Sequence, residues 1–184
     1  MKFYLITFLM IIFSFIIFAS DYDKKEILIL DSLLLDASEN ELSVKVLVDF
    51  IDSLLIKDEF NKLPLLTSYK GAAEVLKGKY AFWPFSKLSY LNDGLELMDK
   101  AVQSDSTDIK TRYMRFIVLH SLPAILGHSS YADKEANKLF SKLVELNNSE
   151  NKFYKTVASL LVNSDRLNSK EVKILLEHYN VAKK

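Results

Sequence analysis

The sequence predicts an all-α protein built from antiparallel helical hairpins. Glycine and proline are scarce, with four and three in 184 residues, whereas sheet proteins need many turns and use more of both. Beyond the first twenty residues, apolar side chains recur at intervals of three and four, which is the spacing of one helix face. Short polar stretches separate these segments. We therefore expect six to seven helices after an N-terminal targeting segment.

The first twenty residues are typical of that targeting segment. Lys2 precedes an uncharged apolar run over residues 3–19, which resembles a secretory signal and is slightly short for a bilayer span. We interpret residues 1–20 as a signal peptide or an N-terminal anchor, and 21–184 as a single all-helical domain. The domain is then exported, either periplasmic or secreted, and any membrane contact is expected only through residues 3–19 if they are retained.

The first half of the domain predicts four helices. A short one over residues 26–35 is followed by a helix with a strong apolar face and an expected capping box at Ser38 and Glu41. Pro64 fits the first turn of the third helix. Gly71 and Gly78 lie on one side of that helix, which indicates either a closely approaching neighbour or fraying. The fourth helix opens at Pro84, and its apolar seam consists of Leu88, Leu91, Leu95, Met98 and Val102.

The second half continues in the same style. A helix over about 108–121 is apolar around much of its circumference, which predicts a central position, and Pro123 stops it. Ser130 with Asp133 predicts the start of the next helix, whose apolar positions run to Leu146. Another helix spans about 153–161. Asn168 with Glu171 predicts a cap for the last one, over 172–179.

One stretch resembles a known repeat family. DKAVQSDSTDIKTRYMRF, at 99–116, looks like the junction between tetratricopeptide repeats, with Gly94 and Ala101 at the two small positions and Ser106 in place of the usual proline. The resemblance covers 67–163. It departs from the family in the missing proline, the lengthened corner at 80–85 and the large Phe116. It implies a short stacked array of hairpins that binds peptides or proteins.

Three further stretches extend the resemblance. YKGAAEVLKGKYAF, NDGLELMDKAV and RYMRF are similar to a group of exported bacterial proteins of unassigned function. This similarity implies the fold and the export, and it carries over no catalytic residue.

Composition excludes several kinds of chemistry. The absence of cysteine rules out disulfides, thiolate metal sites and cysteine nucleophiles. The three histidines lack the pairwise spacing of a zinc helix, and neither nucleotide-binding loops nor a nucleophile elbow is present. No block is basic enough to indicate nucleic acid. We therefore expect no enzyme, no cofactor and no metal.

The stretch GKYAFWPFSK, at 78–87, is the main candidate for binding. It is expected to form a corner between two helices, with Tyr80, Phe82 and Phe85 closing the end of the core. Trp83 is large enough to stay partly exposed, and lysines flank it. The candidate partner-binding residues are Trp83, Lys79, Lys87 and Tyr80.

A second candidate lies in the central helix. Arg112 and Arg115 share one face and could hold a carboxylate or phosphate, or could pair with nearby acids at Asp99, Asp105 and Asp108. His120 is expected to pack against the core. The favoured function is a protein- or peptide-binding scaffold, and the alternative is a small-ligand carrier or enzyme with a pocket near His120, Arg112 and Arg115.

Overall fold

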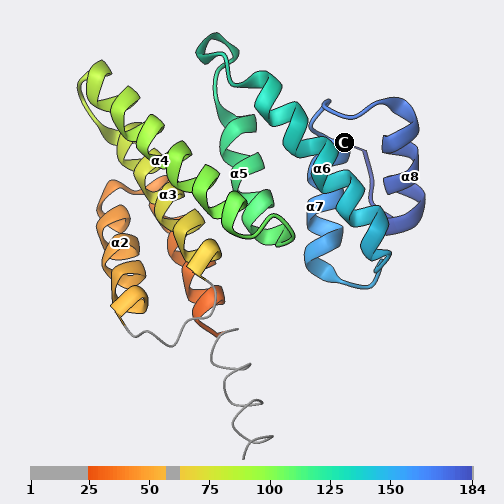
Figure 1. The fold of residues 1–184 in the computed structure, drawn as a ribbon, viewed down its shortest axis with the longest axis horizontal. Helices are drawn as coiled ribbons and strands as arrows, with labels where there is room; N and C mark the ends of the chain where they lie inside the picture. Colours follow the sequence, from red (N-terminus) through yellow and green to blue (C-terminus); the bar gives the residue numbers. More distant parts are fainter. Residues whose placement is uncertain (1–24, 57–62, 184) are drawn as a thin grey trace, which may run out of the picture.

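The protein is all-α over the part of the chain that its structure covers. The computed structural model describes residues 25–56 and 63–183, and within these ranges there are eight α-helices and one 3₁₀ turn but no strand (Figure 1). The all-α class is thus confirmed, whereas the expected six to seven helices were too few, since the described ranges alone hold eight. The expected signal peptide or anchor at 1–20 lies outside the described residues. None of the helices in the described ranges has the length and apolar character needed to span a membrane.

The helices follow one another with short connections. The first covers 25–39. It is followed by α2 (Glu41–Ile56), α3 (Leu63–Tyr80), α4 (Pro84–Ser104), α5 (Ile109–Ser121), η1 (Ala124–Leu126), α6 (Ser129–Leu146), α7 (Lys152–Val162) and α8 (Ser169–Tyr179). The pairs α3–α4, α5–α6 and α7–α8 each pack together, and α3 also packs against α5 (Figure 1).

Most helix boundaries follow local rules. Pro84 occupies the first turn of α4, and Pro123 directly follows Leu122, the C-cap residue of α5. Asn168 forms the predicted capping box with Glu171 at the start of α8. Asp108 caps α5 by accepting hydrogen bonds from the backbone N–H groups of the first turn, which would otherwise lack partners.

Two predicted caps were wrong. The first helix continues through Ser38, whose hydroxyl donates to the Leu35 carbonyl at 2.7 Å, and Asn40 accepts from the Leu42 N–H at 3.0 Å instead. Asn40 is the residue between the two helices, so its side chain is the one that can reach the new helix. The α6 helix begins at Ser129, after His128, and no side chain caps it, so Ser130 is already helical.

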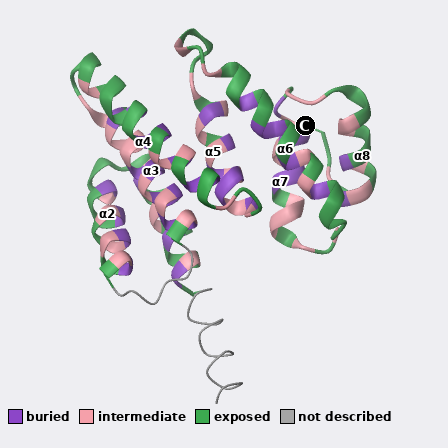
Figure 2. Cartoon of the chain, viewed as in Figure 1, coloured by how far each residue is buried: buried purple, intermediate pink, exposed green. Residues whose placement is uncertain are grey.

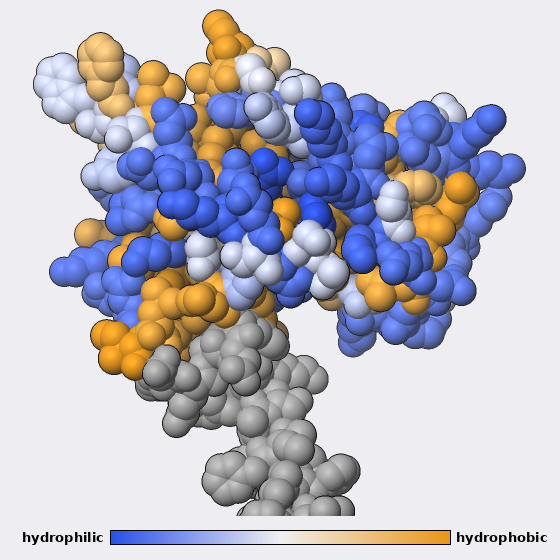
Figure 3. Space-filling model, in the orientation of Figure 1, coloured by the Kyte–Doolittle hydropathy of each residue, from blue (hydrophilic) through white to orange (hydrophobic). Residues whose placement is uncertain are grey.

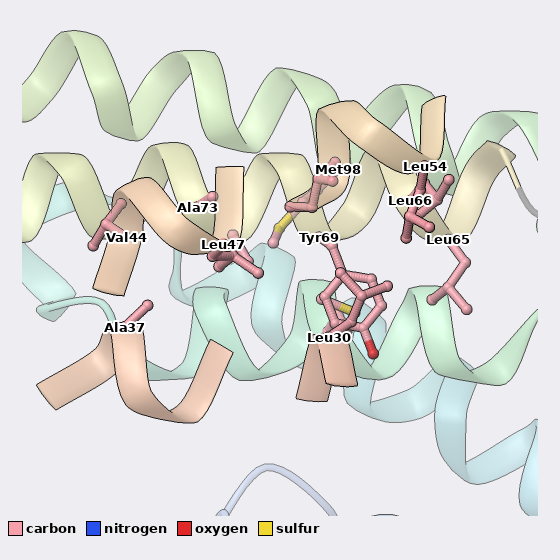
Figure 4. Close-up of a cluster of buried hydrophobic side chains, with 13 residues drawn as sticks. Leu30, Ala37, Val44, Leu47, Leu54, Leu65, Leu66, Tyr69, Ala73 and Met98 are labelled. Atoms are coloured by element: carbon pink, nitrogen blue, oxygen red, sulfur yellow. The ribbon is translucent and has the colours of Figure 1, made fainter. Parts of the chain in front are cut away.

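The core has two main parts. One joins the first helix with α2, α3 and one methionine each from α4 and α5, and Tyr69 lies fully buried in it (Figure 4). The other joins α5 to α8, around Phe116 and Tyr179. Buried positions line the inner sides of all these helices (Figure 2). Outside these two parts, α3, α4 and α5 share an apolar side that is only partly covered, with the first helix at one edge, and that side forms the candidate site.

Candidate functional site

An apolar groove runs between the α3–α4 pair and α5. Its volume is about 900 Å³, within the range of ligand-binding pockets. The first helix supplies one wall, and the connection from α5 to α6 closes the far side. Its lining consists of Leu34, Ser38, Ala72, Val75, Leu76, Gly78, Lys79, Pro84, Lys87, Leu88, Leu91, Met114, Ile117, Val118, Ser121, Leu122, Pro123 and Leu126.

The lining is aliphatic and holds few polar groups. Two serines and two lysines are its only polar side chains, and no aromatic ring contributes to it. The floor includes the buried Ala72, Leu91 and Met114, whereas Leu88 and Ile117 on the facing walls are 45% and 37% exposed. These apolar side chains face water in a concave site. Covering them with an apolar ligand would lower the free energy of the system, because apolar surface would be removed from water.

Close backbone contact between α3 and α4 fixes one wall of the groove. A Cβ on Gly94 would lie 2.5 Å from the Gly71 carbonyl oxygen, and a Cβ on Gly71 would lie 2.7 Å from that of Gly94. A Cβ on Gly78 would lie 3.0 Å from the Lys87 carbonyl oxygen. Gly78 is buried and helical. Of the two interpretations of Gly71 and Gly78, close approach is therefore the observed one.

Lys79 and Lys87 stand at the rim of the groove. Lys79 Nζ donates to the Ser38 carbonyl, which ties α3 to the first helix. Lys87 Nζ donates to the Lys79 carbonyl oxygen at 3.1 Å. Both side chains remain exposed, so their positive charge is available to a ligand at the mouth. Two of the four candidate binding residues therefore belong to the groove.

Tyr80 and Trp83 occupy different places in the same corner. Tyr80 is half-buried, and its hydroxyl donates to the Ala37 carbonyl at 3.1 Å, so it holds the first helix against α3. Trp83 is 66% exposed and meets the ring of Phe82 edge-on, with centroids 5.2 Å apart. Neither residue lines the groove.

The expectation that Phe82 and Phe85 close the core was wrong. They are 83% and 87% exposed, and both project from the corner between α3 and α4. The corner itself was predicted correctly, with Pro84 in the first turn of α4. The start of α2 reaches the hollow beside Phe82, but among the described residues no helix packs over either phenylalanine.

The arginine pair of α5 already holds a carboxylate. Arg112 Nη1 lies 3.0 Å from Glu135 Oε2, and Arg115 Nη1 lies 2.9 Å from Glu135 Oε1. Glu135 comes from α6 and is 2% exposed. Arg115 also pairs with Asp99 at 2.6 Å, as expected from the sequence. The expected pairing of Arg112 with Asp105 or Asp108 was wrong, because Arg112 Nε donates instead to the Ser106 carbonyl at 2.8 Å.

His120 also packs against the core and accepts a hydrogen bond from an arginine. Its ring stacks on the buried Phe116 with centroids 5.5 Å apart, and its Nδ1 accepts a hydrogen bond from Arg166 Nε at 2.9 Å. Burial, followed by the nearby Arg166 charge, lowers the pKa of His120 below its usual value. Arg166 in turn pairs with Asp133 at 2.6 Å. The ring therefore links α5, α6 and the α7–α8 connection.

The comparisons with known proteins give no family. No protein-family model, no curated protein and no solved structure matches this chain. The tetratricopeptide resemblance accordingly stays a prediction. In the described ranges, no three histidine or acidic side chains are arranged to hold a metal ion.

Sequence reasoning missed the groove itself. The helix over 108–121 is apolar around much of its circumference, which predicts a central position, and α5 does contribute to each part of the core. Its Met114, Ile117 and Val118 also line the groove, which this pattern does not predict. The wide apolar surface of this helix was therefore the one sequence signal for the groove. The same pattern is equally typical of a helix that is buried on all sides.

Proposed function

We propose that this chain is an exported binding module that holds the apolar face of a partner protein's helix in the groove between α3, α4 and α5. The single observation that carries the proposal is the open aliphatic groove of about 900 Å³ with Lys79 and Lys87 at its rim. Stacked helical hairpins, as the tetratricopeptide resemblance implies, are a scaffold that commonly presents such a surface.

The groove favours a helix over an extended peptide. An extended segment brings unpaired backbone N–H and C=O groups, and burying them without partners is costly. The groove offers only Ser38, Ser121 and the rim lysines as polar side chains. A helix satisfies its own backbone and presents a stripe of apolar side chains, so it needs no such partners. The two lysines add a preference for an acidic residue beside that stripe.

The alternative function has less support. The proposed pocket near His120, Arg112 and Arg115 would need these groups to be available. Both arginines are engaged with carboxylates, and His120 accepts from Arg166. None of the three residues lines the groove. A small apolar molecule in the groove itself would be the form of this alternative that fits the aliphatic lining.

A display library of helical peptides tests the proposal. Selected peptides should carry apolar residues at i, i+3 or i+4 and i+7, with an acid flanking them. Their affinity, measured by fluorescence anisotropy, should fall at least roughly tenfold in the double variant Leu88→Glu, Ile117→Asp, because two charges would enter an apolar interface. Both positions are partly exposed, so the variant is expected to fold.

The matched control is Ile174→Glu on α8. Ile174 and Leu88 are each 45% exposed, but Ile174 lies outside the groove. It should leave peptide affinity unchanged. Peptides that bind the groove variant as tightly as the wild type would show that the groove is not the site. Displacement of selected peptides by simple aliphatic molecules would favour the small-ligand alternative.

A further inference from the structure

A second exposed apolar feature lies beside the groove and is not part of its lining. Phe82, Trp83 and Phe85 project from the α3–α4 corner, and Ile125, in the connection from α5 to α6, is 92% exposed. We call these four residues the apolar tips. Three of them lie together at one corner, and contiguous exposed apolar surface on a soluble protein generally marks an interaction site.

The two sets of tips lie at the same end of the molecule. The α3–α4 corner and the α5–α6 connection both project at the top of Figure 1. In Figure 3 the second projection is mainly orange, and the first shows orange beside pale surface. The groove lies between them, since Pro84 and Leu88 on one side and Pro123 and Leu126 on the other all line it. The end of α2 lies at the opposite end of the molecule (Figure 1).

The charge around the tips is positive. Residues 75–92 contain three lysines and no acid, and residues 109–132 also contain no acid. Lys79 and Lys87 are exposed in the α3–α4 corner. One carboxylate, Glu41, borders the hollow beside Phe82 and Trp83, and Lys45 and Lys77 border it too. The α3–α4 corner therefore presents apolar side chains beside the exposed Lys79 and Lys87, and the α5–α6 connection adds the uncharged tip Ile125.

We propose that this end of the molecule docks on an anionic lipid bilayer, with the apolar tips inserted among the headgroups. Two separate projections that reach in the same direction fit a broad, deformable surface. Tryptophan is enriched at the boundary between headgroups and acyl chains, and lysines are attracted to anionic lipid. Shallow insertion of apolar side chains combined with basic charge is the usual form of peripheral membrane binding. The proposal concerns the tips and is independent of what fills the groove.

Trp83 provides a local probe because it is the only tryptophan in the chain. The full-length chain is mixed with vesicles of phosphatidylglycerol and phosphatidylcholine, and the Trp83 emission is recorded. Docking should shift the emission to shorter wavelengths, and lipids brominated on their acyl chains should quench it. Because the readout is local to the tip, lipid binding through residues 3–19 alone would leave it unchanged.

The double variant Phe82→Ser, Phe85→Ser keeps the probe and removes two apolar tips. It should weaken vesicle binding by roughly tenfold or more, since less apolar surface enters the bilayer. Ile125→Ser should weaken it to a smaller extent. Ile56→Ser is the matched control, because Ile56 is 82% exposed but ends α2 at the other end of the molecule. It should bind as the wild type does.

Charge variants test the anionic preference. Replacing Lys79 or Lys87 by glutamine should weaken binding by roughly fivefold each, and vesicles of phosphatidylcholine alone should bind weakly. Ile117→Asp alters the groove only and should leave the Trp83 shift intact, which separates this proposal from the proposed function.

Two results would overturn the proposal. One is an unchanged Trp83 emission with vesicles that the chain demonstrably binds. The other is a wild-type dimer, seen by light scattering, that the Phe82→Ser, Phe85→Ser variant converts to a monomer, because the tips would then join two copies of the chain.

Discussion

Two helix pairs in this molecule, α3–α4 and α5–α6, differ in the groups that make their closest contacts. The α3 and α4 helices meet at glycines. A Cβ added at Gly94 would lie only 2.5 Å from the Gly71 carbonyl oxygen. The α5 and α6 helices are joined by charged side chains, with Glu135 of α6 held by Arg112 and Arg115 of α5. The first contact is made by backbone and the second by long side chains.

The difference bears on where the groove and the exposed aromatic corner lie. Glycine contact lets two backbones approach closely and run together along most of their length, so α3 and α4 extend as one arm to an exposed aromatic corner. The charged contact holds α5 and α6 through the reach of arginine side chains. The groove lies where the α3–α4 pair faces α5. Its two lysines belong to that pair, with Lys79 on α3 and Lys87 on α4.

Removing the central carboxylate should have the largest effect. Glu135→Ala leaves Arg112 buried without its anionic partner, and breaking one side of a buried ion pair costs about 3–5 kcal/mol. Urea denaturation should show this loss of unfolding free energy. Asp99→Ala is the control, because Asp99 contacts the same Arg115 from a half-exposed position and should cost about 1 kcal/mol or less. Equal losses of unfolding free energy in the two variants would contradict the expected difference between the buried Glu135 and the half-exposed Asp99.

Adding one methyl group to the glycine contact should have the next largest effect. Gly94→Ala places a carbon against backbone that no side-chain movement can clear, so we expect a loss of about 2 kcal/mol, although alanine's helix preference offsets part of the strain. Gly78→Ala, where the nearest atom is 3.0 Å away, should cost less. Thermal melts of the two variants check this order, and a reversed order would show that the close approach does not govern stability.

The smallest expected effect is a pH dependence at His120. Its pKa is lowered in the folded protein, so the unfolded chain takes up the proton first as pH falls below about 6.5, and stability declines. The contribution is present above that pH and lost toward the lower folded pKa. His120→Gln should flatten the stability profile between pH 7 and 5 by less than about 1 kcal/mol. An unchanged profile would mean that His120 does not titrate differently in the two states.

Local features were predictable where one helix decides them. The α8 capping box at Asn168 and Glu171 and the proline positions at Pro84 and Pro123 depend on residues only a few positions apart. The cap at Ser38 was wrong because Asn40, two residues further on, is a competing cap and lies at the break between the helices.

Partners distant in sequence were not predictable in the same way. Arg112 was expected to pair with the nearest acids, but its partner lies 23 residues away on the next helix. Phe82 and Phe85 flank a predicted helix start, where apolar residues often pack against the core. Nothing in their own segment indicates whether another helix reaches them. Lys79 and Lys87 were proposed for binding from composition alone, and their place at the rim of a groove depends on α5.

By itself, the sequence determined that the described chain is helical, where most helices begin and end, and which residues form the corner between α3 and α4. Apolar periodicity and helix capping depend on residues a few positions apart, so a single sequence is enough to predict them. Only the tertiary structure decided that Glu135 sits between two arginines, that α3 and α4 touch at their glycines, and that an aliphatic groove stays open beside α5. These features depend on distances between segments far apart in sequence, which short-range spacing does not encode.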